Sequence, residues 1–342
     1  MMRILGTETT CDETSAAVVE DGRKVLSNVV SSSALLQRKY RGVVPEIAAR
    51  EQVKVIIPVI SVALDRSDCS IDDIDALAVA YGPGLSGSLL IGVEAAKTLA
   101  LVWKKPLVPV NHLIGHVYAN WIGKKVPQFP LVALIVSGGH TDLILMTDHG
   151  KFRWLGGTRD DAAGEAFDKV ARVLGLGYPG GPEIEKVASQ SQSAKLESSK
   201  RLPRPMISED NFDFSFAGLK TAVVNLVNRH LRGEESSHLG GGDISAIAYE
   251  FQKAICEVLV IKTLRAAKKF NAKSIVVGGG VAANDYLRSQ LTDHGWKLAI
   301  PVFFPPKDLA VDNGAMIAAA AFWFEKTISP LKLQADPALH FA

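Results

Sequence analysis

Two histidines spaced four residues apart are the residues whose types and spacing best fit a chemical role. His112 and His116 lie in residues 111–118, where helical spacing puts both imidazoles on one face, within reach of one metal ion. We expect a third ligand from Asp312, at the head of the last apolar helix. Because the chain has 8 histidines, such a pair also arises by chance, so the spacing alone leaves a metal site and a helix surface equally open.

The start of the chain reads as a hairpin with a polar turn. Residues 4–9 and 15–19 are strand-like, and the turn between them carries Asp12 and Glu13 together with hydroxyl groups. Such a turn is either solvated surface or a site for a phosphate, a metal or an amine. Residues 131–146 repeat this plan around a Gly-Gly turn, so we expect two related halves.

Glycine-rich turns follow three of the expected strands, at residues 82–87, 138–139 and 278–280. A glycine turn between a strand and a helix presents free backbone N–H groups and the positive end of the helix dipole to an anion. For the first turn, close packing of the helix on the sheet is an equally good explanation, and the missing lysine excludes a P-loop. Together, the turns and the repeated hairpins indicate an α/β fold of the actin, Hsp70 and sugar-kinase (ASKHA) architecture, with two duplicated lobes and a cleft between them.

Composition and length fit a globular protein of two lobes. The chain has 342 residues, is 47% hydrophobic, and carries a net charge of +2, which is too small for a protein that coats nucleic acid by charge alone. Its 3 cysteines form no disulfide or zinc pattern, and we find neither a signal sequence nor an apolar run long enough to span a membrane. We therefore expect a cytoplasmic protein that does not bind a membrane.

Motifs spread over nearly the whole chain carry a closer resemblance. They occur at residues 5–14, 42–46, 82–85, 111–116, 136–141, 177–182, 214–221, 279–284 and 312–316. In these motifs and in their order, the sequence resembles the TsaD family of tRNA threonylcarbamoyladenosine synthases, once labelled O-sialoglycoprotein endopeptidases.

The resemblance implies an acyltransferase, a tRNA N6-adenosine threonylcarbamoyltransferase. Such an enzyme passes the threonylcarbamoyl group of L-threonylcarbamoyl-adenylate to N6 of adenosine 37 in tRNAs that read ANN codons, which gives t6A and AMP. The resemblance also implies one divalent metal ion per subunit, Fe²⁺ or alternatively Zn²⁺. The implied partners are tRNA, a shorter TsaB-like paralogue, a TsaE-like ATPase and an upstream enzyme that makes the adenylate.

Carried over by position, the family's site residues fall into two groups. His112, His116 and Asp312 would bind the metal. The residues that would hold the adenylate are Ile135, Val136, Ser137, Gly138, Gly139, Asp168, Gly181, Glu185 and Asn284.

The candidate catalytic base comes from the opening hairpin. The adenylate is already activated and needs no covalent nucleophile, but the N6 amine must lose a proton. The hairpin puts Asp12 and Glu13 near the cleft, where one of them could take this proton, and we assign that role to Glu13.

These residues also set the expected domain boundaries. We expect an N-terminal lobe at residues 1–110, with a C-terminal helix at 312–327 near the lobe junction. A C-terminal lobe at residues 111–311 would carry the histidine pair and the adenylate-binding loops.

The chain departs from the family's usual pattern at several positions. Gln37, Arg41 and Gln52 replace a histidine, a glycine and a histidine, which bears on the docking of tRNA or a partner. Glu185 stands where an aspartate is common, and Ile135 stands where the archaeal branch has a tyrosine ligand. An apolar isoleucine cannot bind a metal, so water or substrate would take that place.

The residues fit two other functions less well, and several basic residues could form a surface for tRNA. A small-molecule kinase of the same architecture would hold Mg²⁺ with carboxylates rather than imidazoles, and a metalloendopeptidase would need a glutamate beside His112, where Leu113 stands. Basic residues that could contact tRNA phosphates, or merely be solvated, are Arg38, Lys39, Arg41, Lys195, Lys200, Arg201 and Arg204.

Overall fold

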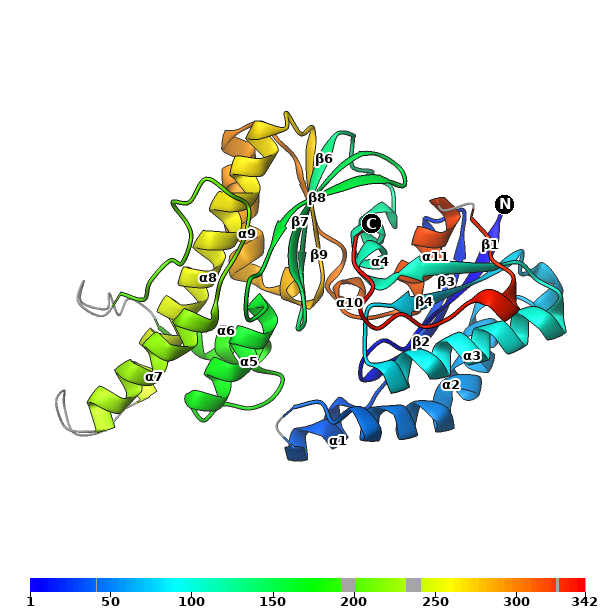
Figure 1. Cartoon of the computed structure of the whole chain (residues 1–342), viewed down its shortest axis with the longest axis horizontal. Helices are drawn as coiled ribbons and strands as arrows, with labels where there is room; N and C mark the ends of the chain where they lie inside the picture. Colours follow the sequence, from blue (N-terminus) through cyan, green and yellow to red (C-terminus); the bar gives the residue numbers. More distant parts are fainter. Residues whose placement is uncertain (41, 192–200, 232–240, 324–325, 342) are drawn as a thin grey trace. The chain divides into compact units, whose positions relative to one another are not determined.

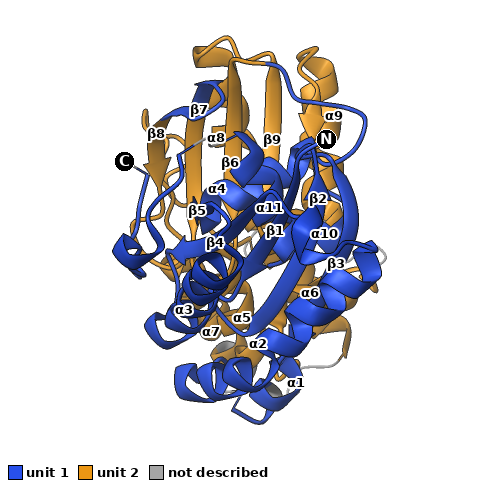
Figure 2. Cartoon of the chain, turned by 90° about the vertical axis from the view of Figure 1, so that its right-hand side faces the viewer, with its two compact units in different colours: residues 1–128, 146–152, 304–342 blue, residues 129–145, 153–303 orange. Residues whose placement is uncertain are grey.

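The chain forms two compact α/β units, which Figure 2 shows in different colours. The structure is a computed structural model, and it describes residues 1–40, 42–191, 201–231, 241–323 and 326–341. Unit 1 consists of Met1–Gln128, Met146–Phe152 and Phe304–Ala342, and unit 2 of Phe129–Leu145 and Arg153–Phe303. This division differs from the expected one at residue 110, because the helix of the histidine pair belongs to unit 1.

Unit 1 is built on a five-stranded sheet in the order β3-β2-β1-β4-β5. Its opening strands form the expected antiparallel hairpin, while β4 and β5 run parallel to β1 (Figure 1). The bounds of its strands are β1 Arg3–Glu8, β2 Glu13–Glu20, β3 Lys24–Ser32, β4 Ala76–Gly82 and β5 Leu107–Asn111.

The helices of unit 1 begin and end at residues whose chemistry fits those positions. Pro45 occupies the first turn of α2, where its missing N–H costs nothing, and Asn111 caps α4 by accepting from the N–H groups of Leu113 and Ile114. The bounds are α1 Ala34–Gln37, α2 Pro45–Ser67, α3 Ser86–Trp103, α4 His112–Tyr118, α10 Lys307–Ala310 and α11 Gly314–Trp323.

Unit 2 repeats the strand plan of unit 1. Its sheet has the order β8-β7-β6-β9-β10, so a first strand again lies between its own hairpin on one side and later strands on the other, which confirms the expected duplication. The strands are β6 Leu131–Val136, β7 Thr141–Asp148, β8 Lys151–Gly157, β9 Ser274–Gly278 and β10 Val302–Phe303, with the β7–β8 turn and the strand ends beside it (Met146–Phe152) assigned to unit 1. The helices are α5 Ala163–Val173, α6 Gly180–Ala188, α7 Ala217–Leu231, α8 Gly241–Lys269 and α9 Asp285–Lys297.

Alternation along the strands of unit 1 gives its sheet two packed faces. Leu5 of β1 belongs to a core shared with Ile56 of α2 and Val93 of α3. Its neighbour Gly6 faces α11, where a Cβ would meet the carbonyl oxygen of Gly314 at 2.4 Å. The two glycines therefore let the backbones of β1 and α11 cross in direct contact.

A glycine also allows α4 to pack closely against α11. A Cβ at Gly115 would meet Ile317 Cδ1 at 2.8 Å, so the lack of a side chain lets α4 lie close to α11. All seven residues of α4 are buried. The histidine pair consequently lies inside unit 1 rather than on a helix surface.

Helix α3 is the one described helix with the length and hydropathy of a membrane span. Glu94 and Lys97 interrupt the apolar residues of this helix, so the sequence contains no uninterrupted apolar run of that length. In unit 1, α3 packs against α2 and β4, and core helices commonly meet the same criterion. Helix α3 is therefore weak evidence for a membrane.

We expect Gly6→Ala and Gly314→Ala to destabilise the protein, because the added methyl group would overlap backbone atoms that cannot move independently. Overpacking of this kind costs about 1–3 kcal/mol or more. Urea unfolding of each variant would measure the loss. Gly218→Ala in α7, where a Cβ meets nothing within 4 Å, is the matched control, and equal stability of Gly6→Ala and wild type would contradict the expectation.

Candidate metal centre and adenylate-binding loops

The structure brings His112, His116 and Asp312 together in unit 1. One potential ligand atom from each lies within 4.8 Å of the others. The Nε2 atoms of His112 and His116 lie 3.6 Å and 3.1 Å from Asp312 Oδ1. Ligand atoms about 2.1 Å from one ion lie about 3.0–3.5 Å apart, so these separations suit a single metal.

A buried carboxylate that the sequence analysis missed orients His112. Glu8 is fully buried, and its Oε2 accepts a hydrogen bond of 3.0 Å from Nδ1 of His112. Its other oxygen accepts from the backbone N–H of Thr10, whose hydroxyl also lies 3.2 Å from Nδ1. With its proton on Nδ1, His112 presents the lone pair of Nε2 toward Asp312, which is the usual support for a metal-bound histidine.

His116 provides the test of whether the residues fit a metal. Its side chain is fully buried, and neither ring nitrogen has a hydrogen-bond partner among the described residues. Nε2 lies 3.1 Å from Asp312 Oδ1 without forming a hydrogen bond to it. Buried polar atoms are rarely left without a partner. A metal ion bound to Nε2 of His116, together with His112 and Asp312, would supply the missing partner.

The charges around His112 and Glu13 point to the same conclusion. Burial lowers the pKa of His112, but the negative charges of Glu8 and Asp312 outweigh it and raise the pKa to about 9. Burial, followed by the charges of Asp312 and Asp12, raises the pKa of Glu13 well above its ordinary value. This part of unit 1 therefore has an excess of negative charge that a cation would relieve.

The turn that carries the candidate base Glu13 is held by a buried glutamine. Gln52 of α2 donates from its Nε2 toward the backbone carbonyls of Thr9, Cys11 and Glu13, at 3.3, 3.0 and 2.9 Å. The Glu13 carboxylate itself accepts from Ser32 at 3.1 Å. Gln52 thus acts on the fold of this turn rather than on a docking surface.

The remaining candidates for tRNA or partner contacts are Gln37, Arg41 and the basic residues. Gln37 is fully buried, and its Oε1 accepts from the backbone N–H of Val44, so it too holds the chain. Arg41 lies outside the described residues, as do Lys195 and Lys200. Arg204 pairs with Glu250 and Glu257 in unit 2, so its charge is already neutralised.

The glycine turn at residues 82–84 serves close packing. A Cβ at Gly82 would overlap the carbonyl oxygen of Asp336 at 1.9 Å, and one at Gly84 would meet the carbonyl oxygen of Thr10 at 2.6 Å. The backbone N–H of Gly84 bonds to Pro337. Close packing accounts for these glycines, but they pack against the C-terminal segment and Thr10, not by bringing the helix onto the sheet as the sequence suggested.

In unit 2, the predicted adenylate residues gather at one edge of the sheet. Strands β6 and β9 are parallel, so the loops that follow them meet at the same edge. Ile135 and Val136 are buried at the end of β6, and a Cβ at Gly279 would meet the carbonyl oxygen of Val136 at 2.4 Å. Residues 137–139 lie in the loop beyond, where Gly138 and Gly139 are exposed and have open space around them.

Three further predicted residues hold helix starts at this edge. Asp168 accepts from the N–H of Gly180 at 2.7 Å, and Glu185 accepts from the N–H of Asp285 at 2.6 Å. Asn284 caps α9 and donates to Gln252 at 2.8 Å. Gly181 lies in the first turn of α6, where a Cβ would meet nothing within 4 Å.

The fold and these sites define an α/β protein of the ASKHA class with a buried His-His-Asp centre. Two solved structures are similar to this chain over 94% of its length, and at their low sequence identity they show the fold alone. HypF from T. kodakarensis has a TM-score of 0.60, 13% identity and 48% coverage of its own chain. Component A of Acidaminococcus fermentans (R)-2-hydroxyglutaryl-CoA dehydratase has a TM-score of 0.53, 15% identity and 98% coverage.

Sequence comparison gives the family. The model of TsaD, tRNA N6-adenosine threonylcarbamoyltransferase, matches residues 24–319. Proteins of that name from Moorella thermoacetica and Thermomicrobium roseum are 48% and 50% identical, with 98% and 94% of this chain covered and 96% and 92% of theirs. The chain belongs to the TsaD family of transferases, which confirms the resemblance seen in its motifs.

We expect Glu8→Gln to weaken metal binding by about 10–100-fold, because the neutral amide no longer fixes the charge and orientation of His112. Competition with a chelator would measure the affinity for Zn²⁺ or Fe²⁺. Glu94→Gln, on exposed α3 surface beside Lys97, is the control. Unchanged affinity in Glu8→Gln would show that the contact with His112 does not support the metal.

Proposed function

We propose that the protein transfers the threonylcarbamoyl group of L-threonylcarbamoyl-adenylate to N6 of adenosine 37 in tRNAs that read ANN codons, releasing AMP. Membership of the TsaD family over residues 24–319 is the observation that carries this proposal. The buried cluster of His112, His116 and Asp312 supports it, because it could hold a metal ion of the kind that the reaction can use.

The reaction needs positioning and proton transfer rather than a covalent nucleophile. The N6 amine attacks the carbamoyl carbon, a C–N bond forms, and the bond between that carbon and the phosphate oxygen breaks. AMP leaves with the electron pair, and the N6 proton passes to a base. We assign this base to Glu13, which a cation bound beside Asp312 would keep in its ionised, proton-accepting form.

We propose that His112, His116 and Asp312 hold Fe²⁺, with Zn²⁺ as the alternative. Two imidazoles and one carboxylate suit either ion and leave positions for other oxygen ligands. When bound, such an ion would polarise a carbonyl or phosphate oxygen and stabilise the negative charge that develops there. Glu8 would keep His112 in the tautomer that this binding requires.

We assign the adenylate to the edge of the unit 2 sheet. The exposed backbone of Gly138 and Gly139 offers N–H groups to a phosphate, and the first turns of α6 and α9 add the positive ends of two helix dipoles. Ser137, Gly181, Asp168, Glu185 and Asn284 would shape this edge or use their remaining hydrogen-bonding atoms on the ligand.

The proposed partners are tRNA, a TsaB-like paralogue, a TsaE-like ATPase and the enzyme that supplies the adenylate. We propose that the paralogue covers α2, where Val53 and Ile57 are 63% and 55% exposed. We place the protein in the cytoplasm, which suits three cysteines that form no disulfide. Neither a kinase nor an endopeptidase is favoured by a specific observation in the described residues.

Reconstitution tests the proposal directly. Purified protein loaded with Fe²⁺ or Zn²⁺ would be mixed with L-threonylcarbamoyl-adenylate and unmodified tRNA, with and without the partner proteins. We expect t6A in digested tRNA by mass spectrometry and an equal amount of AMP. No modified nucleoside in any mixture would overturn the proposal.

We expect Glu13→Gln to reduce the rate of transfer by about 10²–10⁴-fold, the usual contribution of a general base, while adenylate binding stays intact. Single-turnover transfer and equilibrium binding of the adenylate would separate the two effects. Glu46→Gln, an exposed change in the first turn of α2, serves as the control. Unchanged transfer in Glu13→Gln would reject the assignment of the base.

A further inference from the structure

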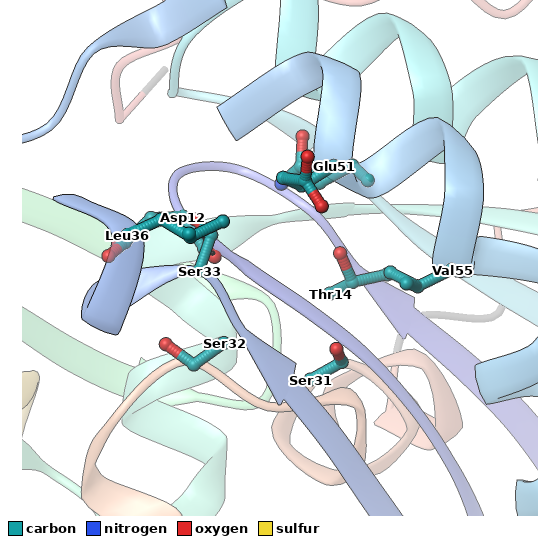
Figure 3. Close-up of a pocket in the computed structure, with 9 residues that line it drawn as sticks. Asp12, Thr14, Ser31, Ser32, Ser33, Leu36, Glu51 and Val55 are labelled. Carbon is teal, nitrogen blue, oxygen red and sulfur yellow. Dashed lines mark hydrogen bonds between the residues drawn. The ribbon is translucent and has the colours of Figure 1, made fainter. Parts of the chain in front are cut away.

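A small cavity in unit 1 has no role in the proposed reaction. It has a volume of about 70 Å³ and lies between α2, the start of β2 and the segment that joins β3 to α1 (Figure 3). The oxygen-bearing side chains that line it are Asp12, Thr14, Ser31, Ser32, Ser33, Glu51 and Gln52, and Leu36 and Val55 complete the lining. By volume, the cavity has room for an ion together with several water molecules.

One buried residue of the lining has a polar atom without a partner. Gln52 is 1% exposed, its Nε2 donates to the turn at residues 9–13, and its Oε1 has no hydrogen-bond partner among the described residues. Leaving such an atom unpaired in a folded protein is costly, so it indicates an occupant. Thr14 is also 1% exposed, and Figure 3 shows its hydroxyl between Glu51 and Ser31.

The chemistry of the lining selects the kind of occupant. Asp12 and Glu51 provide two carboxylates, and Gln52 and the hydroxyl groups provide neutral oxygens. These oxygen atoms can coordinate a cation, and no lining side chain carries a positive charge that would neutralise an anion. The one ion pair at the cavity joins Glu51 Oε1 to Lys54 at 2.5 Å, within the described residues. Lys54 is 63% exposed, and an ion pair of that kind contributes little.

We propose that this cavity is a second cation site, which binds a hydrated Mg²⁺ ion through Asp12, Thr14, Glu51 and Gln52. Hard divalent cations prefer oxygen ligands, and Mg²⁺ keeps several of its waters, as the cavity allows. The site differs in chemistry from the His-His-Asp centre, whose imidazoles select softer transition metals. Occupied, it links α2 to the start of β2 and neutralises Asp12 beside Glu13.

Mn²⁺ provides a spectroscopic probe of this site. The full-length protein would first be loaded with one equivalent of Zn²⁺, which imidazole ligands hold far more tightly than Mn²⁺. Titration with Mn²⁺, followed by electron paramagnetic resonance, should reveal one further site, and Mg²⁺ should displace the Mn²⁺. Binding should also raise the unfolding temperature, because the ion binds only the folded protein.

Substitutions on one helix and one strand distinguish this site from adventitious binding. We expect Glu51→Gln and Thr14→Val each to weaken Mn²⁺ by about tenfold, while Glu46→Gln, on the same helix, leaves it unchanged. Thr14→Val keeps the shape of the side chain, so the strand remains folded, which circular dichroism would check. No bound Mn²⁺ at millimolar concentration, or equal binding in Glu51→Gln and Glu46→Gln, would overturn the proposal.

Because the Zn²⁺-loaded protein needs no tRNA or adenylate for this measurement, its outcome does not depend on the proposed transferase reaction.

Discussion

The direct backbone contact between Gly6 of β1 and Gly314 of α11 is the constraint on which the candidate metal centre depends. A side chain on either glycine would occupy space that backbone atoms fill. Asp312 lies two residues before Gly314, and Glu8 lies two residues after Gly6, so this crossing sets the positions of both carboxylates. Gly115 then lets α4 pack against α11 and brings the histidines to them. These three glycines thus set the positions of the ionisable side chains of the candidate metal centre.

Charge is the second constraint. Burial and neighbouring carboxylates raise the pKa values of Glu13 and of His112, so without a cation the acid tends to keep its proton and the imidazole to gain one. Both changes are ways of reducing the same excess of negative charge in a buried region. A divalent ion bound by His112, His116 and Asp312 removes the need for either. This group of residues is therefore more stable with a cation bound than with its carboxylates ionised and unpaired.

The sequence supported inferences that depend on local spacing and failed where long-range contacts decide. The i, i+4 spacing placed His112 and His116 on one face, and repeated strand patterns gave the duplicated sheets, because neighbours along the chain determine both. Glu8 looked like an ordinary strand residue, since its partner His112 is over one hundred positions away. The role of Gly82 depends on Asp336, and the lobe boundary at residue 110 depends on α11, which only the folded chain brings to α4.

The predicted adenylate residues show how the two kinds of information combine. The resemblance predicts Asp168, Glu185 and Asn284 as ligand-binding side chains, yet each accepts a hydrogen bond from an N–H group at the start of a helix. The first two bonds fix the start of α6 relative to α5 and the start of α9 relative to α6, and the third caps α9. The exposed glycine backbone of that loop has no side chain to shield it. A phosphate bound at this edge, as we propose, would therefore meet backbone N–H groups first, while the three side chains position the helices beside them.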